Sequence, residues 1–550
     1  MVVHDVLFFS DVGDKSINDY QVSTPINVPM LLEMLEGRYA DYEYIKSGFL
    51  NGFTLGLIPN PSLKSSHKKS NRNVAELKRK LKVELDSGRI IGPFSEKPIS
   101  NMMTSPIYVI PKPNTTKWRM IFDLSAPKGF SVNQNIPEAN RTVKYCTIKS
   151  VIDFATSLDS SEVHFAKLDI TDAYRLVPMA KSQWKFLGLK LENDYYIDIR
   201  LPMGSSSSCQ IFQRVSDMFK WVYSTYQSDP HKIFNYLDDF LIVAPSKPAC
   251  ERVLSNVLML SNGLGVPIAE HKTETATQSL IFLGIGLDAK SQSLYIPESK
   301  RLEVMDMIVS FLDNRAPKVK LWQKLLGKLC HLSQVLVAGR TFLSSVYGSL
   351  QGILSQDQHL CRRISKEVRL DLLVWYDFLL KISPGKSFKY ISAKGANVAM
   401  YTDASKTIGF GGWCNNDWFH GIWPDMFWKA KNIAVLELFP ILVGLELWKD
   451  RFSDKVVNIY TDNKALVPVV EKLYCKDPEI RRILRPIALS CMQNNILLIP
   501  VHIKGDENTR ADLLSRNRIM HFREMYPSMS RYPTQLPEVL NPIAIRAQLW

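Results

Sequence analysis

The sequence predicts a multidomain α+β protein, and three observations carry this prediction. The chain has 550 residues of ordinary globular composition, 22% charged and 46% hydrophobic; such a length corresponds to about three to five packed units. Short β-type runs and helical segments are mixed in its first half. Residues 298–382 are helix-rich, and from about Ala396 strands and helices alternate, which indicates an α/β layer.

In the first half, residues 1–60 show no clear pattern, and the basic, polar stretch PSLKSSHKKSNRN after them is typical of a linker or exposed loop. From Asn73, apolar residues at helical spacing predict a helix that stops at Gly88. Strands are predicted in SPIYVIPKP, KWRMIFDLS and VHFAKLDI, and a helix over about 206–224. IFNYLDDFLIVAP predicts two strands around a tight acidic turn, and SLIFLGIGLD with SLYIP predicts a further hairpin.

In the second half, the helix-rich region carries basic residues interleaved among apolar positions: Lys318, Lys320, Lys324, Lys328 and Arg340. After it, MYTDAS and GFGGWC predict strands, then a helix follows, then a strand in VVNIYTDN. We expect helical segments from there to the end of the unit. The tail after about Arg523 is interrupted by Pro and allows no prediction.

Charge and cysteine usage narrow the class of protein only partly. The net charge is +14, from 68 Lys and Arg against 54 Asp and Glu, which leaves a nucleic-acid partner open because phosphate neutralisation needs clustered basic residues. The 8 cysteines lie far apart without a C-x-x-C pair, so we expect neither a zinc knuckle nor a disulfide framework. No signal peptide or membrane-spanning stretch is recognisable. We therefore expect an intracellular protein, cytoplasmic or nuclear, with no membrane partner.

Three carboxylates in the first half form a candidate metal site. Asp169 ends the apolar run HFAKLD, and Asp238 and Asp239 stand together in YLDD between two apolar runs. Adjacent carboxylates repel each other, and Mg²⁺, which prefers oxygen ligands, would relieve that repulsion. Two such ions could activate a primer hydroxyl and stabilise the leaving pyrophosphate. Taken alone, an Asp-Asp pair between apolar runs is typical of a solvated turn, so the neighbouring motifs decide.

Those motifs carry a family resemblance. KLDITDAYRLVPM, LPMGSSSSCQIFQ, YLDDF and FLG follow in this order over about residues 75–290, and together they resemble the polymerase domain of retroelement reverse transcriptases. PKPNTTKWRMIFDLS resembles the fingers hairpin of that family. The resemblance implies a right-hand polymerase with fingers, palm and thumb.

The resemblance also implies roles for the acidic and basic residues. Asp169 and Asp238 match the catalytic, metal-binding carboxylates, and Asp239 is the third acidic residue of the family. Lys112 and Arg119 match the basic pair that grips the incoming triphosphate, a role suited to a point charge and a forked donor. Either of these two alone would be ordinary surface charge.

Further nucleotide contacts follow from the same resemblance. Tyr174 matches the bulky residue that excludes a 2′-hydroxyl and so selects deoxynucleotides, although an aromatic after a strand is more often part of a core. Gly204, which permits close approach of the backbone, and Gln213 lie in the segment that faces template and nucleotide. Met203 is a departure, because retroviral enzymes often have Gln there. A polar contact near the nucleotide is thereby lost.

A primer grip is implied at Phe282, Leu283 and Gly284. Lys272, in HKTE, is a weaker candidate for the residue that protonates the leaving pyrophosphate.

A second acidic set lies in the C-terminal part: Asp403 in YTDAS, Glu437 in AVLELFP, Asp462 in IYTDN and Asp512 in RADLLSR. Two of these follow apolar β-type runs and two lie in apparent helices. Packed together, they could bind two Mg²⁺ ions and position water for phosphodiester hydrolysis. His502, on the flexible-looking stretch HIKGDEN, could shuttle protons. Each residue alone is common at such places.

The ordered set is similar to the ribonuclease H domains of reverse transcriptases over about residues 398–520, and GFGGW fits the hairpin of that fold. The residues between the two matches would then form thumb and connection, with Lys and Arg that suit contacts to duplex phosphates. The predicted domains are an N-terminal extension (1–72), fingers and palm (73–297), thumb and connection (298–395), an α/β ribonuclease H-like domain (396–520) and a tail (521–550).

The segment TPINVPMLLEMLEGRYADYEYIKSGFLNGFTLGL, with LIFLGIGLD and GRTFL, resembles DIRS-like retrotransposons, which encode a tyrosine recombinase. No D-[ST]-G protease site is visible upstream of the polymerase match, and no integrase-like zinc motif is visible. Such activities, if the element has them, would lie on another chain or on missing sequence.

The leading hypothesis is a Mg²⁺-dependent reverse transcriptase with ribonuclease H activity, with Mn²⁺ as an alternative ion. Its partners would be an RNA template, a DNA primer, the RNA–DNA hybrid and dNTP substrates. The rival hypothesis is a domesticated or inactive remnant that only binds nucleic acid. Loss of catalytic carboxylates would be expected of such a remnant, and none is missing.

Overall fold

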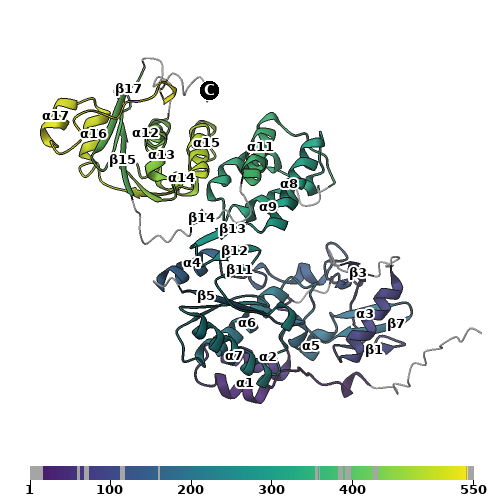
Figure 1. Cartoon of the computed structure of the whole chain (residues 1–550). Coiled ribbons are helices and arrows are strands. Elements are labelled where there is room, and N and C mark those ends of the chain that lie inside the picture. Colours follow the sequence, from purple (N-terminus) through teal and green to yellow (C-terminus); the bar gives the residue numbers. More distant parts are fainter. Residues whose placement is uncertain are drawn as a thin grey trace, which may run out of the picture. The chain divides into compact units, whose positions relative to one another are not determined.

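The computed structural model describes residues 16–58, 62–66, 73–111, 118–158, 162–353, 357, 359–381, 388–389, 398–424, 432–540 and 542. The chain divides into two compact units, which are described separately: Met1–Thr147 with Glu162–Thr277, and Ile148–Ser161 with Gln278–Trp550. Both units combine helices with sheets, which confirms the predicted α+β multidomain class (Figure 1). None of the described helices is long and apolar enough to cross a membrane.

The elements of the first unit follow in chain order: η1 (Ile17–Asp19), α1 (Val28–Leu35), α2 (Tyr42–Asn51), α3 (Val74–Asp86), β1 (Ile90–Phe94), β2 (Thr104–Ser105), β3 (Ile107–Pro111), β4 (Trp118–Phe122), η2 (Val132–Asn135), η3 (Glu138–Asn140), β5 (His164–Asp169), η4 (Ala173–Leu176), α5 (Lys181–Trp184), β6 (Gly188–Leu191), β7 (Asp194–Asp198), α6 (Ser208–Thr225), β8 (Lys232–Tyr236), β9 (Asp239–Ala244), α7 (Lys247–Gly263), η5 (Glu270–Lys272) and β10 (Glu274–Thr277).

The sheet that positions the first acidic set has the order β10-β5-β9-β8 and is antiparallel throughout. Its strands β5, β8 and β9 lie where apolar runs predicted them, and helices α6 and α7 contact the sheet. Apolar side chains of β5, α6 and β9, among them Ala166, Phe212 and Phe240, are buried in one core. Because β8 and β9 are joined by a tight turn, the acidic dipeptide lies at the end of the sheet, as the sequence predicts.

Two helices, α1 and α2, lie in the segment that shows no clear pattern in the sequence. Leu31, Leu35 and Ile45 are buried and belong to the same hydrophobic core as Phe212 of α6. The isolated bridge between Phe53 and Met179 ties the end of this segment to the sheet region. These N-terminal residues are therefore an integral part of the first unit.

The second unit begins with α4 (Ile148–Ser157) and continues with β11 (Ser279–Phe282), β12 (Ile285–Asp288), β13 (Ser293–Tyr295), α8 (Glu298–Asp313), α9 (Val319–Leu332), η6 (Val337–Leu343), α10 (Ser344–Leu350), α11 (Lys366–Lys381), β14 (Phe388–Lys389), β15 (Val398–Ala404), β16 (Gly409–Cys414), β17 (Asp417–Ile422), α12 (Ile433–Leu447), α13 (Lys449–Phe452), β18 (Val456–Thr461), α14 (Val467–Lys472), α15 (Pro478–Gln493), β19 (Leu497–His502), α16 (Thr509–Ser515), α17 (Ile519–Met525) and η8 (Glu538–Leu540).

The predicted hairpin and the predicted helix-rich region are both present. Strands β11, β12 and β13 pair in an antiparallel sheet that β14 extends. Helices α8 to α11 follow, and α11 is joined to α15 by an ion pair in which Arg485 Nη2 lies 2.6 Å from Asp371 Oδ1. Thr341 also donates a hydrogen bond of 2.5 Å to the carbonyl of Leu473, so the helical region contacts the C-terminal layer.

The C-terminal layer is a mixed sheet of order β17-β16-β15-β18-β19. The hairpins β17–β16 and β16–β15 are antiparallel, and β15, β18 and β19 are parallel. Met400 of β15 lies against Gly444 of α12, whereas Gly411 of β16 lies against Leu514 of α16, so these two helices cover opposite faces (Figure 1). The predicted alternation of strands and helices is thus confirmed.

One prediction is wrong in this layer. Helical segments were expected throughout after VVNIYTDN, but residues Leu497–His502 form strand β19, which pairs with β18. This run contains Pro500, which is tolerated because β19 is the edge strand of the sheet. His502 is consequently the last residue of a strand.

The tail also contributes to the packing of this layer. Phe522 of α17 is fully buried, and its ring lies 5.0 Å from that of Trp418 on β17. Met529 joins the same cluster, so the packed layer continues past residue 520.

Candidate active sites

The first acidic cluster consists of Asp169, Asp238 and Asp239. Asp169 ends β5, Asp239 begins β9, and the two residues lie directly opposite each other in the antiparallel ladder. Asp238 lies in the turn between β8 and β9, where its main-chain carbonyl accepts a hydrogen bond of 3.0 Å from the N–H of Ile170. The structure therefore brings Asp169 beside Asp238 and Asp239, which stand about seventy positions later in the sequence.

The electrostatics of this cluster favour a cation. Burial, together with the charge of Asp169, raises the pKa of Asp238 above its ordinary value. Burial also raises the pKa of Asp239, against the opposing charge of Lys167. Carboxylates crowded in this way are stabilised by a positive charge, and their oxygen atoms are the donors that Mg²⁺ takes. The residues present thus fit a divalent ion.

One positive charge is supplied by the protein itself. Lys272 Nζ lies 2.8 Å from Oδ1 of Asp169, and this hydrogen bond raises the pKa of Lys272. Lys272 belongs to η5, next to the point where the N–H of Ala269 donates a hydrogen bond of 2.8 Å to the carbonyl of Asp169. An ammonium held beside these carboxylates can deliver a proton to a departing phosphate oxygen.

Helix α6 makes hydrogen bonds to the acidic turn. Gln213 is buried, its Oε1 accepts a hydrogen bond of 3.0 Å from the N–H of Leu237, and its Nε2 donates one of 3.1 Å to Asp217. Both ends of the Gln213 amide are therefore used inside the unit. Its predicted role in nucleotide binding stays a prediction, and the contact that the structure shows is with the turn that carries Asp238.

Tyr174 lies close to the first acidic cluster. Its ring stacks on Phe212 at a centroid distance of 5.0 Å, and its hydroxyl donates to Cys209 Sγ at 3.3 Å. Burial raises its pKa most, and the hydrogen bond to Cys209 and the charge of Asp238 add to the effect. The ring is half-buried and held from two sides, beside carboxylates that fit a divalent ion.

Gly204 is required by a close main-chain approach. A Cβ at this position would lie 1.8 Å from the carbonyl oxygen of Phe122 at the end of β4. The loop is also tied by Asn133, whose amide donates a hydrogen bond of 2.9 Å to the Gly204 carbonyl. The close approach that the structure shows is to the protein's own backbone, and the predicted contact of Gly204 with the nucleotide stays a prediction. Met203, beside it, is 55% exposed.

The remaining polymerase candidates are less closely gathered. Arg119 is exposed on β4, opposite Ile110 of β3, and Lys112 lies outside the described residues. In the second unit, Phe282 ends β11, and Leu283 and Gly284 form the turn to β12 with φ of +49° and +74°. The Gly284 carbonyl accepts a hydrogen bond of 3.2 Å from Lys300 of α8, which ties this turn to the helical region.

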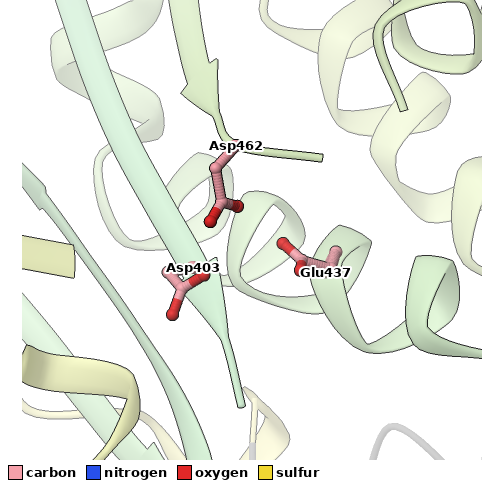
Figure 2. A group of neighbouring side chains, drawn as sticks. All are labelled: Asp403, Glu437 and Asp462. Carbon is pink, nitrogen blue, oxygen red and sulfur yellow. The ribbon is translucent and has the colours of Figure 1, made fainter. Parts of the chain in front are cut away.

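The second acidic cluster is the tightest group of potential metal ligands among the described residues. Asp403 of β15, Glu437 of α12 and Asp462, just after β18, each offer a carboxylate oxygen, and these atoms lie within 4.8 Å of one another. Figure 2 shows the three side chains pointing toward a common centre. Because β15 and β18 are parallel neighbours, both strand ends meet at the same edge of the sheet.

Burial makes the charged forms of this cluster costly. It raises the pKa of Glu437 to about 9, with added repulsion from Asp403 and Asp462. Burial likewise raises the pKa of Asp403 to about 6, and the charges of Asp462 and Asp512 contribute. A divalent cation would offset this repulsion, and an all-carboxylate donor set suits Mg²⁺ or Mn²⁺.

Asp512 and His502 lie beside this group. Asp512, on α16, pairs with Arg516, whose Nε lies 2.6 Å from Asp512 Oδ1. His502 is exposed at the end of β19, in register with Thr461, the residue before Asp462. All five candidates thus gather at one end of the sheet.

Sequence reasoning missed several residues that support the clusters. Ser515 is fully buried, and its single hydroxyl proton faces two acceptors, Asp403 Oδ2 and, at 3.0 Å, the Asp512 carbonyl. Ser515 and Arg516 both stand in the quoted motif RADLLSR, so their position was visible although their contacts were not. Ser216, whose hydroxyl donates a 2.5 Å hydrogen bond to the Leu237 carbonyl, left no signal in the sequence.

The first cluster defines a class of site. Carboxylates at the end of an antiparallel sheet, with a lysine on one of them, suit phosphoryl and nucleotidyl transfer. Residues 110–287, roughly a third of the chain, match the family model described as reverse transcriptase (RNA-dependent DNA polymerase). This segment is therefore similar to reverse transcriptases of the type found in retroviruses and retroelements.

Individual relatives are distant. The chain is 24% identical over 196 residues to the Gag-Pro-Pol polyprotein of Human T-cell leukemia virus 2, and 22% identical over 231 residues to the Gag-Pol polyprotein of Avian reticuloendotheliosis virus. These matches cover 34% and 40% of this chain but only 12% and 18% of the polyproteins. Among solved structures, a foamy viral protease-reverse transcriptase in complex with double-stranded DNA aligns at a TM-score of 0.49, with 13% identity, over 88% of this chain and 83% of that chain.

Proposed function

We propose that this chain is a reverse transcriptase, which extends a DNA primer with dNTPs on RNA and DNA templates. The observation that carries the proposal is the pairing of Asp169 with Asp239 across β5 and β9, with Asp238 in the adjoining turn. This arrangement lies inside the segment that matches the reverse transcriptase family.

In this proposal different residues bind the metal ion, the triphosphate, the sugar and the primer. Asp169 and Asp238 would hold Mg²⁺, which, when bound, supplies Lewis-acid stabilisation of the charge on the transferred phosphate. Lys272, which pairs with Asp169, would give a proton to the leaving pyrophosphate. Lys112 and Arg119 would bind the triphosphate, and Tyr174 would exclude nucleotides with a 2′-hydroxyl. Phe282, Leu283 and Gly284 would contact the primer.

We further propose that the C-terminal layer is a ribonuclease H that degrades RNA in RNA–DNA hybrids. The support is the convergence of Asp403, Glu437 and Asp462, with Asp512 and His502 at the same end of the sheet. Asp512 would join the metal ligands when Arg516 releases it, and His502 is exposed and free to move a proton at the scissile phosphate. The helices between the two sites would then serve as thumb and connection.

The same resemblance that suggested the element type supports a finer proposal, that the chain serves replication of a DIRS-like retrotransposon. Sequencing the genomic DNA that flanks the coding region tests it. A neighbouring reading frame for a tyrosine recombinase is expected, and flanking integrase and protease frames would contradict it.

The first experiment is primer extension on an RNA template with dNTPs and Mg²⁺. Wild type and Asp229→Asn, a surface aspartate of the same unit, should extend the primer, and Asp238→Asn should not. If folded wild-type protein binds template-primer and none of the three extends it, the chain is a nucleic-acid-binding remnant and the polymerase proposal fails.

The nuclease proposal has its own assay, cleavage of the RNA strand in a labelled hybrid. Asp512→Asn and Asp403→Asn should abolish cleavage and retain primer extension, whereas exposed Asp450→Asn should retain both activities. Asp238→Asn should show the opposite loss. If Asp512→Asn, Asp403→Asn or Asp238→Asn lost both activities together, two independent sites would be the wrong description.

A further inference from the structure

Arg175, a residue to which the sequence analysis assigned no role, is buried in the first unit with every arm of its guanidinium engaged. Nη1 and Nη2 donate hydrogen bonds of 3.0 and 2.9 Å to the two carboxylate oxygens of Asp198. Nε donates one of 3.0 Å to Glu84, and Nη1 a further one of 3.3 Å to the carbonyl of Leu201. The residue is only 8% exposed.

The pair belongs to a larger network of alternating charge. Arg89 contacts Glu84 at 3.5 Å and Asp172 at 2.7 Å. Arg200 is also buried, and its main-chain N–H donates a hydrogen bond to Asp198. Burial together with the charge of Arg175 lowers the pKa of Arg200 to about 10. Three arginines thus stand against three carboxylates. Removing ions from water is costly, and well-packed apolar residues often serve stability equally well, so this network suggests a demand for defined geometry.

The network joins four parts of the chain, two of which adjoin nucleotide candidates in the sequence. Glu84 belongs to α3, Asp198 ends β7, and Leu201 opens the loop that leads to Gly204. Arg175 itself lies in the short 3-10 turn η4, immediately after Tyr174. The turn begins at Asp172, which is in the left-handed region with φ of +48°, so its backbone depends on outside contacts.

Tyr174 is therefore held from two directions. On the side-chain side, its ring stacks on Phe212 and its hydroxyl donates to Cys209. Its main chain is held through the next residue, Arg175. The Arg175 guanidinium makes a forked, two-point pair with Asp198 and a third hydrogen bond to Glu84. A lysine cannot reproduce this fork, because its ammonium is a single point charge.

We infer that Arg175 is a positioning residue for sugar selection, which sets the place of the Tyr174 ring by locking η4 to α3 and β7. This inference rests on the proposed polymerase function and on the proposed role of Tyr174. Small displacements of positioning groups have large effects on rate, so a shift of the Tyr174 ring would weaken its exclusion of a 2′-hydroxyl. Loss of the fork should therefore impair discrimination between dNTPs and rNTPs.

The test is the ratio of kcat/KM for dNTP to that for rNTP in single-nucleotide primer extension. This ratio does not depend on the fraction of correctly folded enzyme, so a merely destabilising change leaves it unaltered. Arg175→Lys should lower the ratio about tenfold or more, and Glu84→Gln, which alters a less buried partner, should lower it to a smaller extent. Arg252→Lys is the matched control, because Arg252 makes a two-point pair with Asp229 at 2.9 and 2.6 Å on the surface of the same unit.

The outcomes separate the inference from the proposals beneath it. If Tyr174→Ala lowers the ratio but Arg175→Lys and Glu84→Gln leave it at the value of the Arg252→Lys control, Arg175 is only structural and the inference is overturned. If Tyr174→Ala itself leaves the ratio unchanged, the role of Tyr174 fails and the inference fails with it. Absence of any extension by folded wild type overturns the polymerase proposal first.

Discussion

The side-chain oxygen of Gln213 accepts a hydrogen bond of 3.0 Å from the main-chain N–H of Leu237. Leu237 has φ of +53°, in the left-handed region that costs a residue with a side chain about 1–2 kcal/mol. Ser216, on the same helix, donates a 2.5 Å hydrogen bond to the Leu237 carbonyl. Helix α6 thus offsets the strain of the turn that presents Asp238, and the first prediction follows from this contact.

Gln213→Met should lower both stability and polymerase rate. The variant leaves the Leu237 N–H without its partner, which costs about 1–3 kcal/mol in unfolding free energy, and it loosens Asp238, so kcat should fall more than KM for dNTP rises. Denaturant unfolding and steady-state primer extension measure the two effects. Gln227→Met, just beyond the end of α6, is the control. An unchanged kcat in folded Gln213→Met would show that the acidic turn holds its shape without this bond.

Lys272→Met should reduce primer extension and alter its Mg²⁺ dependence. The ammonium that pairs with Asp169 at 2.8 Å is lost, and removal of a proton donor typically costs about 10²–10⁴-fold in rate. Half-saturation should also occur at lower Mg²⁺ concentration, because no lysine competes for Asp169. A Mg²⁺ titration of extension rate tests both parts, with Lys247→Met on the surface of α7 as the control. A normal rate would remove the proton-donor role from Lys272.

Mg²⁺ should stabilise the C-terminal layer through the second acidic cluster. An ion bound only by the folded state adds about 1.4 kcal/mol at ten times its Kd, seen as a higher Tm for the transition of the full chain. In Glu437→Gln this increment should shrink, because one of the three converging carboxylates is gone. Asp450→Asn should keep the wild-type increment. An equal Mg²⁺ effect in all three proteins would place the stabilising ion elsewhere.

Asp371 should make folding stability depend on pH in the acidic range. Burial raises the pKa of this carboxyl from 3.8 to about 6, so between about pH 4 and 6 the folded state binds more protons than the unfolded state. Stability from this group is therefore highest below pH 4 and falls as pH rises to 6, by up to about 3 kcal/mol. Urea unfolding at pH 4, 5, 6 and 7 measures the slope.

Asp371→Asn should remove that part of the slope, because the amide does not titrate. Asp377→Asn, on the exposed face of the same helix, should retain it. If Asp371→Asn and wild type lose stability in parallel between pH 4 and 6, another group is responsible.

Local patterns in the sequence were sufficient for most elements. The apolar runs around YLDD, the runs in SPIYVIPKP and KWRMIFDLS, and the helix near 206–224 all form the predicted structures, because the spacing of apolar residues reports directly on the period of a strand or helix. The same patterns located Asp169, Asp403 and Asp462 at strand ends. They failed at Leu497–His502, which forms an edge strand where helical segments were predicted.

The chain itself therefore specified the elements and the acidic residues at their ends, since periodicity and strand boundaries are properties of neighbouring residues. Which side chains contact one another was decided by the tertiary packing. Glu437 reaches Asp403 and Asp462 only because α12 packs on this sheet, and Arg175 meets Glu84 and Asp198 only because η4, α3 and β7 are packed together. Such contacts join segments far apart in the sequence, and their energy comes from burial and pairing that no local pattern encodes.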